Sequence, residues 1–155
     1  MQILLEEVCQ NIRNYFCDYY RGDVCTGEFE IVNGEIKGVN GSKTPVIYSG
    51  MYYRIVGSRL NNGIFLAGTD TPTDEETFDG EIWLMRIPAA FLALVAEIKE
   101  WQTKNGGADS ANMSPFASES FGGYSYSKGG SNAGGGTSVS WQSQYASRLN
   151  AWRKI

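Results

Sequence analysis

Residues 29–38 read FEIVNGEIKG and join two β-prone runs through the pair Asn33-Gly34. Asn-Gly supplies the two positive φ angles of a type I′ turn, so this stretch predicts a β-hairpin. Three further runs, 45–57, 64–68 and 81–87, are also rich in residues that favour β-strands. The pairs Asn62-Gly63 and Asp79-Gly80 precede the second and third of these runs and are expected to form turns. Between residues 23 and 87 we therefore expect five or six antiparallel strands that form a small barrel or sandwich.

Helices are expected on both sides of this β-rich region. Apolar residues recur every three or four positions over residues 3–19, which indicates one amphipathic helix. Pro88 suits the first turn of a second helix, over 88–104, because proline has no amide hydrogen to leave unpaired there. A third helix is expected over 140–153, with Ser138 or Ser140 as its N-cap.

The expected fold class is α+β: a small bundle of three helices with an inserted antiparallel β-rich lobe, barrel- or sandwich-like, and a long Gly/Ser-rich loop. The expected parts are an N-terminal helix, β-lobe and central helix over 1–105, a flexible Gly/Ser-rich loop with an aromatic strand over 106–137, and a C-terminal docking helix over 138–155. These parts are expected to make one domain, because 155 residues suit a single core.

Composition excludes several classes of function. The chain has 13 Lys and Arg against 17 Asp and Glu, for a net charge of -4, so specific nucleic-acid binding is not expected. It has no histidine, which removes the usual base of serine and cysteine triads and the usual zinc ligand. We expect no catalytic residues, no metal and no cofactor. No apolar run reaches the roughly 20 residues of a membrane span, so no membrane association is expected, and the thiols are expected to be reduced in a cytoplasm.

Two segments only partly resemble ligand-binding motifs. Residues 34–44 contain glycines and Lys43, as a phosphate-binding loop does, but Ser42 separates Gly41 from the lysine and a strand follows instead of a helix. The acidic segment 69–81 lacks the ligand spacing of a calcium loop. Both are interpreted as solvated turns.

The C-terminal helix carries the clearest periodic signal. Trp141, Tyr145, Leu149 and Trp152 follow one another at helical spacing, and Arg153 and Lys154 come directly after them. Such a stripe either packs on the other helices or docks in a groove of a partner, and both roles are compatible. Because tryptophan and arginine are enriched in interface hot spots, Trp152 is the expected hot spot.

Residues 119–127 read ESFGGYSYS, between the second helix and the terminal LNAWRKI. This segment resembles the one that recurs in head-tail connector (adaptor) proteins of tailed bacteriophages and prophages. The resemblance covers roughly residues 88–155. It implies partner binding through Glu119, Gly122, Tyr124 and Tyr126, together with the C-terminal helix.

The resemblance further implies a structural virion protein of the phage neck that joins the portal to the tail. Its subunits would form a homo-oligomeric ring, commonly of twelve copies, that contacts the portal protein and the tail or next neck protein. DNA could pass through such a ring. The protein would be assembled in the bacterial host cytoplasm and would end in the virion.

The alternative is a β-barrel binding module of a phage tail or baseplate that recognises a carbohydrate or a receptor. It requires exposed aromatic residues on the β-rich block, where the candidates are Tyr48, Tyr52, Tyr53, Phe65 and Trp83. In that case the terminal helix would belong to the core.

Overall fold

The computed structural model describes residues 1–105, 118–121, 124–127 and 140–155. For residues 118–121 and 124–127 it describes the backbone alone. The chain divides into two compact units, one of residues 1–89 with 154–155 and one of residues 90–153. The two units are described separately below.

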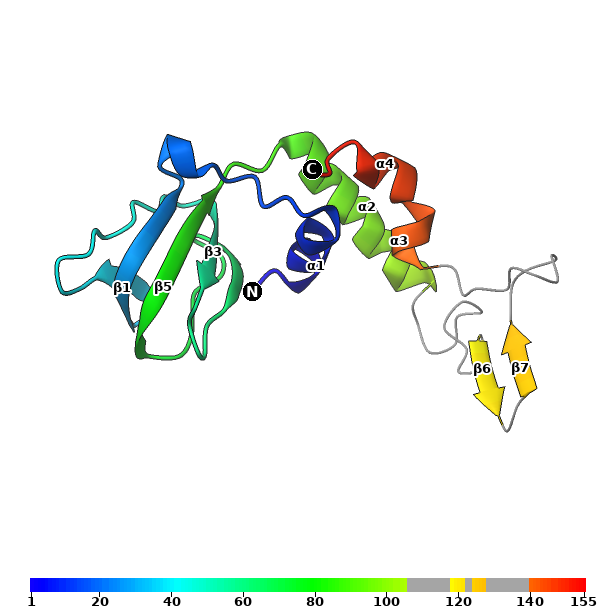
Figure 1. The fold of residues 1–155 in the computed structure, drawn as a ribbon, viewed down its shortest axis with the longest axis horizontal. Helices are drawn as coiled ribbons and strands as arrows, with labels where there is room; N and C mark the ends of the chain where they lie inside the picture. The colour runs from blue at the N-terminus through cyan, green and yellow to red at the C-terminus, as the bar shows by residue number, and fades with distance from the viewer. Residues whose placement is uncertain (106–117, 122–123, 128–139) are drawn as a thin grey trace. The chain divides into compact units, whose positions relative to one another are not determined.

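The first unit is built on a five-stranded antiparallel sheet. Its strands are β1 (Val24–Val32), β2 (Glu35–Gly38), β3 (Tyr52–Val56), β4 (Gly63–Leu66) and β5 (Glu76–Met85). They lie in the order β2-β1-β5-β3-β4, so the long strand β5 is central and pairs with both β1 and β3 (Figure 1). The sheet curls, and Gly34, in the turn between β1 and β2, lies directly against Thr71 of the loop after β4.

The hairpin at Asn33-Gly34 is confirmed. Both residues have positive φ angles, 52° and 78°, and Val32 pairs with Glu35 across the turn. The prediction of a turn at Asp79-Gly80 is wrong, because this pair lies inside β5, where Gly80 faces Gly27 of β1. Glycine is required there for a different reason: a Cβ atom at Gly80 would collide with the backbone oxygen of Val56.

The core of this unit lies on one face of the curled sheet. Alternating residues of four strands are buried there: Phe29, Ile31, Tyr53, Ile55, Phe65, Phe78 and Ile82. The partly buried side chains of Ile36 and Ile47 pack against the same cluster. Burial of this apolar surface is the main term that stabilises the unit.

Helix α1 (Ile3–Ile12) is shorter than the predicted helix over 3–19. It ends at Arg13, whose φ of 55° is left-handed. Beyond this point the chain follows the sheet instead: the Tyr15 ring packs edge-on against Trp83 at 5.3 Å, and a single 3-10 turn, η1 (Tyr19–Arg21), follows. Tertiary contacts with the sheet therefore override the helical periodicity of residues 13–19.

The predicted fold class, a three-helix bundle with an inserted β-lobe, is wrong. The fold is mostly a curled, antiparallel five-stranded sheet, and the described residues contain four α-helices, of which only α1 and α2 are long. Helix α1 packs on β4 of the sheet, with Leu5, Val8, Cys9 and Ile12 buried, and belongs to the sheet unit. Its apolar face is covered by a strand, so it is not a member of a helical bundle.

The second unit contains α2 (Ala89–Asn105), which confirms the helix predicted over 88–104. The predicted helix over 140–153 is present as two short helices, α3 (Trp141–Gln144) and α4 (Ala146–Asn150). The break is at Tyr145, whose φ and ψ of -106° and 8° are not helical. Ser140 caps α3 as expected, and its side chain accepts a hydrogen bond from the Ser143 amide at 3.3 Å.

Strands β6 (Ser118–Phe121) and β7 (Tyr124–Ser127) form an antiparallel pair that is a sheet of its own. The rest of the Gly/Ser-rich segment predicted as a flexible loop over 106–137 lies outside the described residues. Among the described helices, none is both long and apolar enough to cross a membrane.

Candidate functional site

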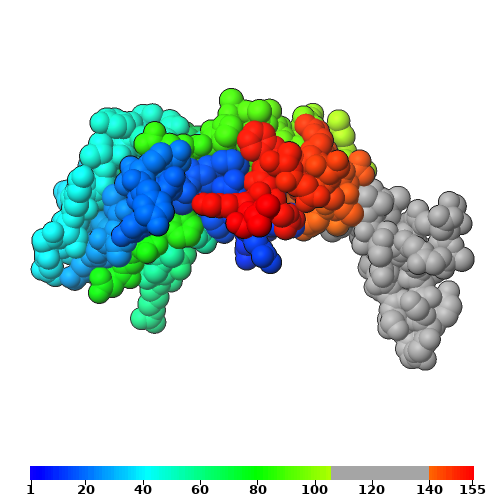
Figure 2. All heavy atoms as spheres, turned by 45° about the horizontal axis from the view of Figure 1, so that its top comes forward, coloured from blue at the N-terminus to red at the C-terminus, as the bar shows by residue number. Residues whose placement is uncertain are grey.

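The aromatic stripe of the C-terminal segment packs within its own unit. Trp141 and Leu149 are 7% and 1% exposed, and the Trp152 ring meets the Phe91 ring edge-on with centroids 5.6 Å apart. The Tyr145 ring meets Trp101 of α2 in the same way, at 6.5 Å. Figures 1 and 2 show α3 and α4 lying along α2. The structure thus brings all four predicted residues together, as the internal packing of α2, α3 and α4.

Charged residues mark the outer side of this packing. Arg148 forms a two-pronged ion pair with Glu97 of α2, with N–O distances of 2.5 and 3.0 Å. The hydrogen bonds that Arg148 donates to Glu97 lower the pKa of Glu97 and raise the pKa of Arg148. Both side chains are exposed, as are Arg153 and Lys154. The two predicted cationic contact residues are therefore accessible.

The other predicted contact residues belong to the β6–β7 hairpin. The register places Glu119 opposite Tyr126 and Phe121 opposite Tyr124. Gly122 lies outside the described residues. The hairpin pairing agrees with the strand expected there, and no further strand pairs with it among the described segments.

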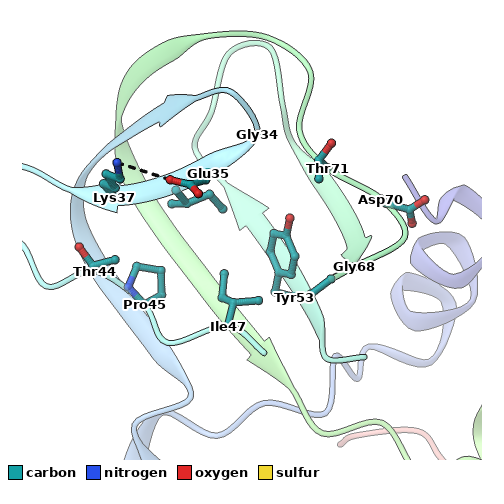
Figure 3. A pocket seen from close by; sticks show the side chains of 12 residues that line it. Gly34, Glu35, Lys37, Thr44, Pro45, Ile47, Tyr53, Gly68, Asp70 and Thr71 are labelled. Carbon is teal, nitrogen blue, oxygen red and sulfur yellow. Dashed lines mark ion pairs between the residues drawn. The ribbon is translucent and has the colours of Figure 1, made fainter. Parts of the chain in front are cut away.

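A pocket of about 350 Å³ lies in the sheet unit, in the seam between the edge strand β2 and the segment that follows β4. Figure 3 shows how its walls are built. They are formed by Gly34, Glu35, Ile36 and Lys37, by Thr44, Pro45 and Ile47, and by Tyr53, Ala67, Gly68, Asp70 and Thr71. The floor is thus apolar and the rim polar, which is the usual pattern of a binding pocket.

Tyr53 is the central polar residue of this pocket. It projects from β3 into the seam (Figure 3), is only 3% exposed, and its ring stacks on Phe65 at 5.6 Å. Burial, with a smaller contribution from the negative charge of Asp70, raises the pKa of Tyr53 to about 12. Its hydroxyl is therefore protonated at neutral pH, yet no hydrogen-bond partner for it is found among the described residues. Because this hydroxyl lines an open pocket, it offers one donor and one acceptor to a ligand.

The charged groups on the rim of the pocket are paired with groups of opposite charge. Asp70 accepts hydrogen bonds from the Gln2 side chain and from the Leu66 amide, the latter at 3.3 Å. The Gln2 hydrogen bond is the largest cause that lowers the pKa of Asp70, so this carboxyl is ionised at neutral pH. Glu35 and Lys37 form an exposed ion pair at 3.5 Å and offset each other. The N-terminal amine of Met1 lies 3.6 Å from Asp70 and offsets its charge, so the rim carries no excess charge of either sign.

Strand β2 offers an open edge beside the pocket. The Val39 amide donates to the Glu28 oxygen at 3.0 Å, so Val39 and Glu28 are a hydrogen-bonded pair. Along an antiparallel ladder, hydrogen-bonded residue pairs alternate with pairs that are not hydrogen-bonded. Lys37 and Glu35 are therefore the next bonded partners of β1, while the N–H and C=O of Ile36 point away from it. The Gly38 amide points the same way and donates to Thr44 Oγ1 at 3.0 Å. Ile36 is thus the position where this edge can accept a partner.

The opposite edge of the sheet is covered. The Gln2 amide donates to the Ile64 oxygen of β4 at 2.7 Å, and the Leu66 amide donates to Asp70. The Leu66 oxygen accepts from the amides of Thr69 and Asp70, at 3.0 and 2.8 Å. The outward oxygens of Ile64 and Leu66 and the Leu66 amide therefore have local partners, in contrast to the outward groups of Ile36.

The aromatic platform required by the alternative function is not formed. Tyr53 and Phe65 are buried, whereas Tyr48 is 67% exposed. The Trp83 ring packs against Tyr15, and its Nε1 donates to Glu81 at 2.6 Å. Tyr52 is half-buried next to Tyr53 on β3. The five aromatic side chains thus lie in different environments and do not form one stacking surface.

The acidic and glycine-rich segments have structural roles. Burial raises the pKa of Glu76, but hydrogen bonds from Ser58, Asn61 and the Leu60 amide outweigh it and lower that pKa overall. Gly41 forms a turn with a φ of 85°, and no helix begins there. Across the described ranges no three metal-ligating side chains gather at one point.

Sequence reasoning did not single out the pocket. The pair Tyr52-Tyr53 is visible in the sequence, but only the strand register shows which ring faces the core. The open edge at Ile36 likewise depends on the pairing of β2 with β1.

Comparisons with models of protein families, with curated proteins and with solved structures found no match to this chain.

Proposed function

We propose that this protein is a structural subunit of a multi-chain assembly, namely a connector subunit in the neck of a tailed bacteriophage. The observation that carries the proposal is the β6–β7 hairpin, whose eight strand residues contain most of the connector-like segment ESFGGYSYS. A two-stranded hairpin alone is marginally stable in water, so it gains from a partner strand or surface. The sheet of the first unit and the helices of the second each have their own buried packing.

The contact surface proposed here differs from one centred on Trp152. Because Trp141, Tyr145, Leu149 and Trp152 pack against α2, their main role is to position the exposed face of this unit. Arg153 and Lys154 are exposed and supply cationic contacts for an acidic surface of the portal protein. The hairpin residues Glu119, Gly122, Tyr124 and Tyr126 supply the contacts to the neighbouring copies of the ring.

The proposal can be tested by copurification with the portal protein encoded nearest to this chain. We expect the full-length chain to be retained by portal rings, and native mass spectrometry to show a closed ring of copies on them. A variant with residues 118–127 replaced by glycine and serine of equal length should remain folded but lose retention. Arg59→Ala, which removes an exposed cation distant in sequence from the contact residues, is a control that should be retained normally.

Two results would contradict the proposal. One is the absence of any complex between the wild-type chain and that portal. The other is normal retention of the variant with the replaced hairpin.

The alternative, a β-barrel binding module, is favoured by one observation, the pocket with the unpaired Tyr53 hydroxyl. It is not favoured by the aromatic residues, which do not form a platform. The pocket is compatible with a connector as well, because a structural subunit can carry a peptide-binding site.

A further inference from the structure

We infer that the seam between β2 and the segment after β4 binds an extended peptide, which adds a strand to β2 and inserts one side chain into the pocket. The inference does not depend on the neck assignment. It rests on three features of the first unit: the outward backbone groups of Ile36, the buried hydroxyl of Tyr53 and the cavity between them.

The backbone geometry selects the class of ligand. Ile36 presents one N–H donor and one C=O acceptor on the same edge, side by side with the cavity. A residue of an extended peptide carries the complementary pair in the same spacing, and strand addition of this kind draws its affinity from such backbone bonds. The site is short, since Gly38 is already occupied by Thr44 on one side and the turn at Asn33-Gly34 ends β2 on the other.

The cavity selects the side chain. Its volume of about 350 Å³ accommodates one long side chain, and Ile36, Ile47 and Ala67 provide an apolar wall for its stem. The Tyr53 hydroxyl then requires a hydrogen-bonding group at the end of that side chain. Because the carboxyls of the rim are already paired, Asp70 with the N-terminal amine and Glu35 with Lys37, this group is uncharged, as in glutamine.

Backbone addition and side-chain insertion are mutually compatible on a strand. Residues next to each other along an extended peptide alternate between the two faces of the sheet. The peptide residue that pairs with Ile36 therefore has its side chain on the same face as Ile36, which is the core side where Tyr53 lies, while its neighbours point to the other face. This arrangement makes specificity depend on Tyr53 and affinity depend on Ile36.

The test is a selection from a library of random linear peptides against the full-length protein, followed by binding measurements on the variants. Peptides that bind should share a glutamine-like residue and should shift the Ile36 amide resonance. Tyr53→Phe should weaken binding about tenfold, the effect of one lost hydrogen bond. Tyr48→Phe, which removes a hydroxyl from an exposed tyrosine outside the pocket, is the matched control and should bind normally.

The backbone part has its own pair of variants. Ile36→Pro removes the outward N–H without removing a bond to β1, and should weaken binding about tenfold, whereas Ile36→Val keeps the N–H and should bind normally. If Ile36→Pro fails to fold, the shift of the Ile36 amide in the wild type decides the point. The inference is overturned if no peptide is selected, if Tyr53→Phe binds as tightly as Tyr48→Phe, or if the Ile36 amide does not respond.

Discussion

Trp152, near the end of the chain, packs edge-on against Phe91 in the first turn of α2, with ring centroids 5.6 Å apart. Phe91 is fully buried and Trp152 is half-buried, so this contact connects two segments that are more than 60 residues apart in sequence. The residue that the sequence marks as a hot spot for partners is therefore part of the packing of its own unit.

Truncation of this side chain should consequently destabilise the unit. Trp152→Ala should lower the free energy of unfolding by about 2 kcal/mol, less than for a fully buried tryptophan because part of the ring is exposed. Hydrogen exchange should locate the loss in α2 and leave β5 protected. The matched control is Arg153→Ala, at an exposed position, which should change stability by less than about 0.5 kcal/mol. Equal stability of the two variants would contradict the packing role.

Gly80→Ala should destabilise the sheet. The added methyl group would meet the backbone oxygen of Val56 where β5 crosses the end of β3, and backbone atoms cannot rotate aside. We expect a loss of about 2 kcal/mol in chemical denaturation, as for other overpacked sites. Thr77→Ala, at an exposed position of the same strand, is the control and should cost less than half as much. A neutral Gly80→Ala would show that β3 and β5 separate there.

Asp23 should control the acid stability of the protein. Its carboxyl is 1% exposed and binds Arg86 at 2.9 Å and Arg21 at 3.1 Å. Burial raises the pKa of Asp23, but the hydrogen bonds from Arg86, the Asp18 amide and Arg21 outweigh it and lower the pKa below the ordinary 3.8. A carboxyl with a lowered folded pKa stabilises the fold above its unfolded pKa, and this stability is lost as the pH falls through the folded value.

The corresponding measurement is the unfolding free energy of wild type and Asp23→Asn between neutral pH and about pH 2. The wild type should be more stable by about 2 kcal/mol at neutral pH, and the difference should shrink below pH 3.8. A difference that stays constant over this range would show that the charge of Asp23 is not responsible.

Cys9 should be chemically silent in the folded protein. It lies on the buried face of α1, and burial raises its pKa to about 12, so almost no thiolate exists at neutral pH. A thiol reagent should label Cys9 only at the rate at which α1 opens, and mild denaturant should accelerate the labelling. Mass spectrometry of the labelled peptide provides the measurement. Rapid labelling without denaturant would mean that α1 is not packed on β4.

The sequence predicts features that depend on neighbouring residues and fails for those that depend on distant ones. Asn33-Gly34 forms the expected turn because its φ angles are a local property. The similar pair Asp79-Gly80 lies in mid-strand, since a close approach of Val56 requires glycine there. The helical pattern of residues 3–19 is real, but it stops at Arg13 because Tyr15 packs against Trp83 and Arg54.

The same distinction applies to the candidate sites. The spacing of Trp141, Tyr145, Leu149 and Trp152 predicts the stripe and leaves open whether it packs on the other helices or on a partner; the structure shows that it packs on α2. Tyr52 and Tyr53 are both tyrosines on neighbouring positions, and only the strand register determines that Tyr53 is the one buried in the seam. The fold class was wrong for a related reason: the amphipathic face of α1 shows that it is buried, not that β4 covers it.

The unequal edges of the sheet have a consequence for how copies of this protein can meet. Gln2 and Asp70 occupy the outer side of β4, so this sheet can be extended only past β2. A sheet with one free edge accepts added strands on that edge alone. It cannot form part of a sheet that continues from copy to copy, because every copy in such a sheet pairs on both edges. Strand addition on the five-stranded sheet is therefore self-limiting: it ends with one guest strand, or with two copies joined edge to edge, and does not propagate along that sheet.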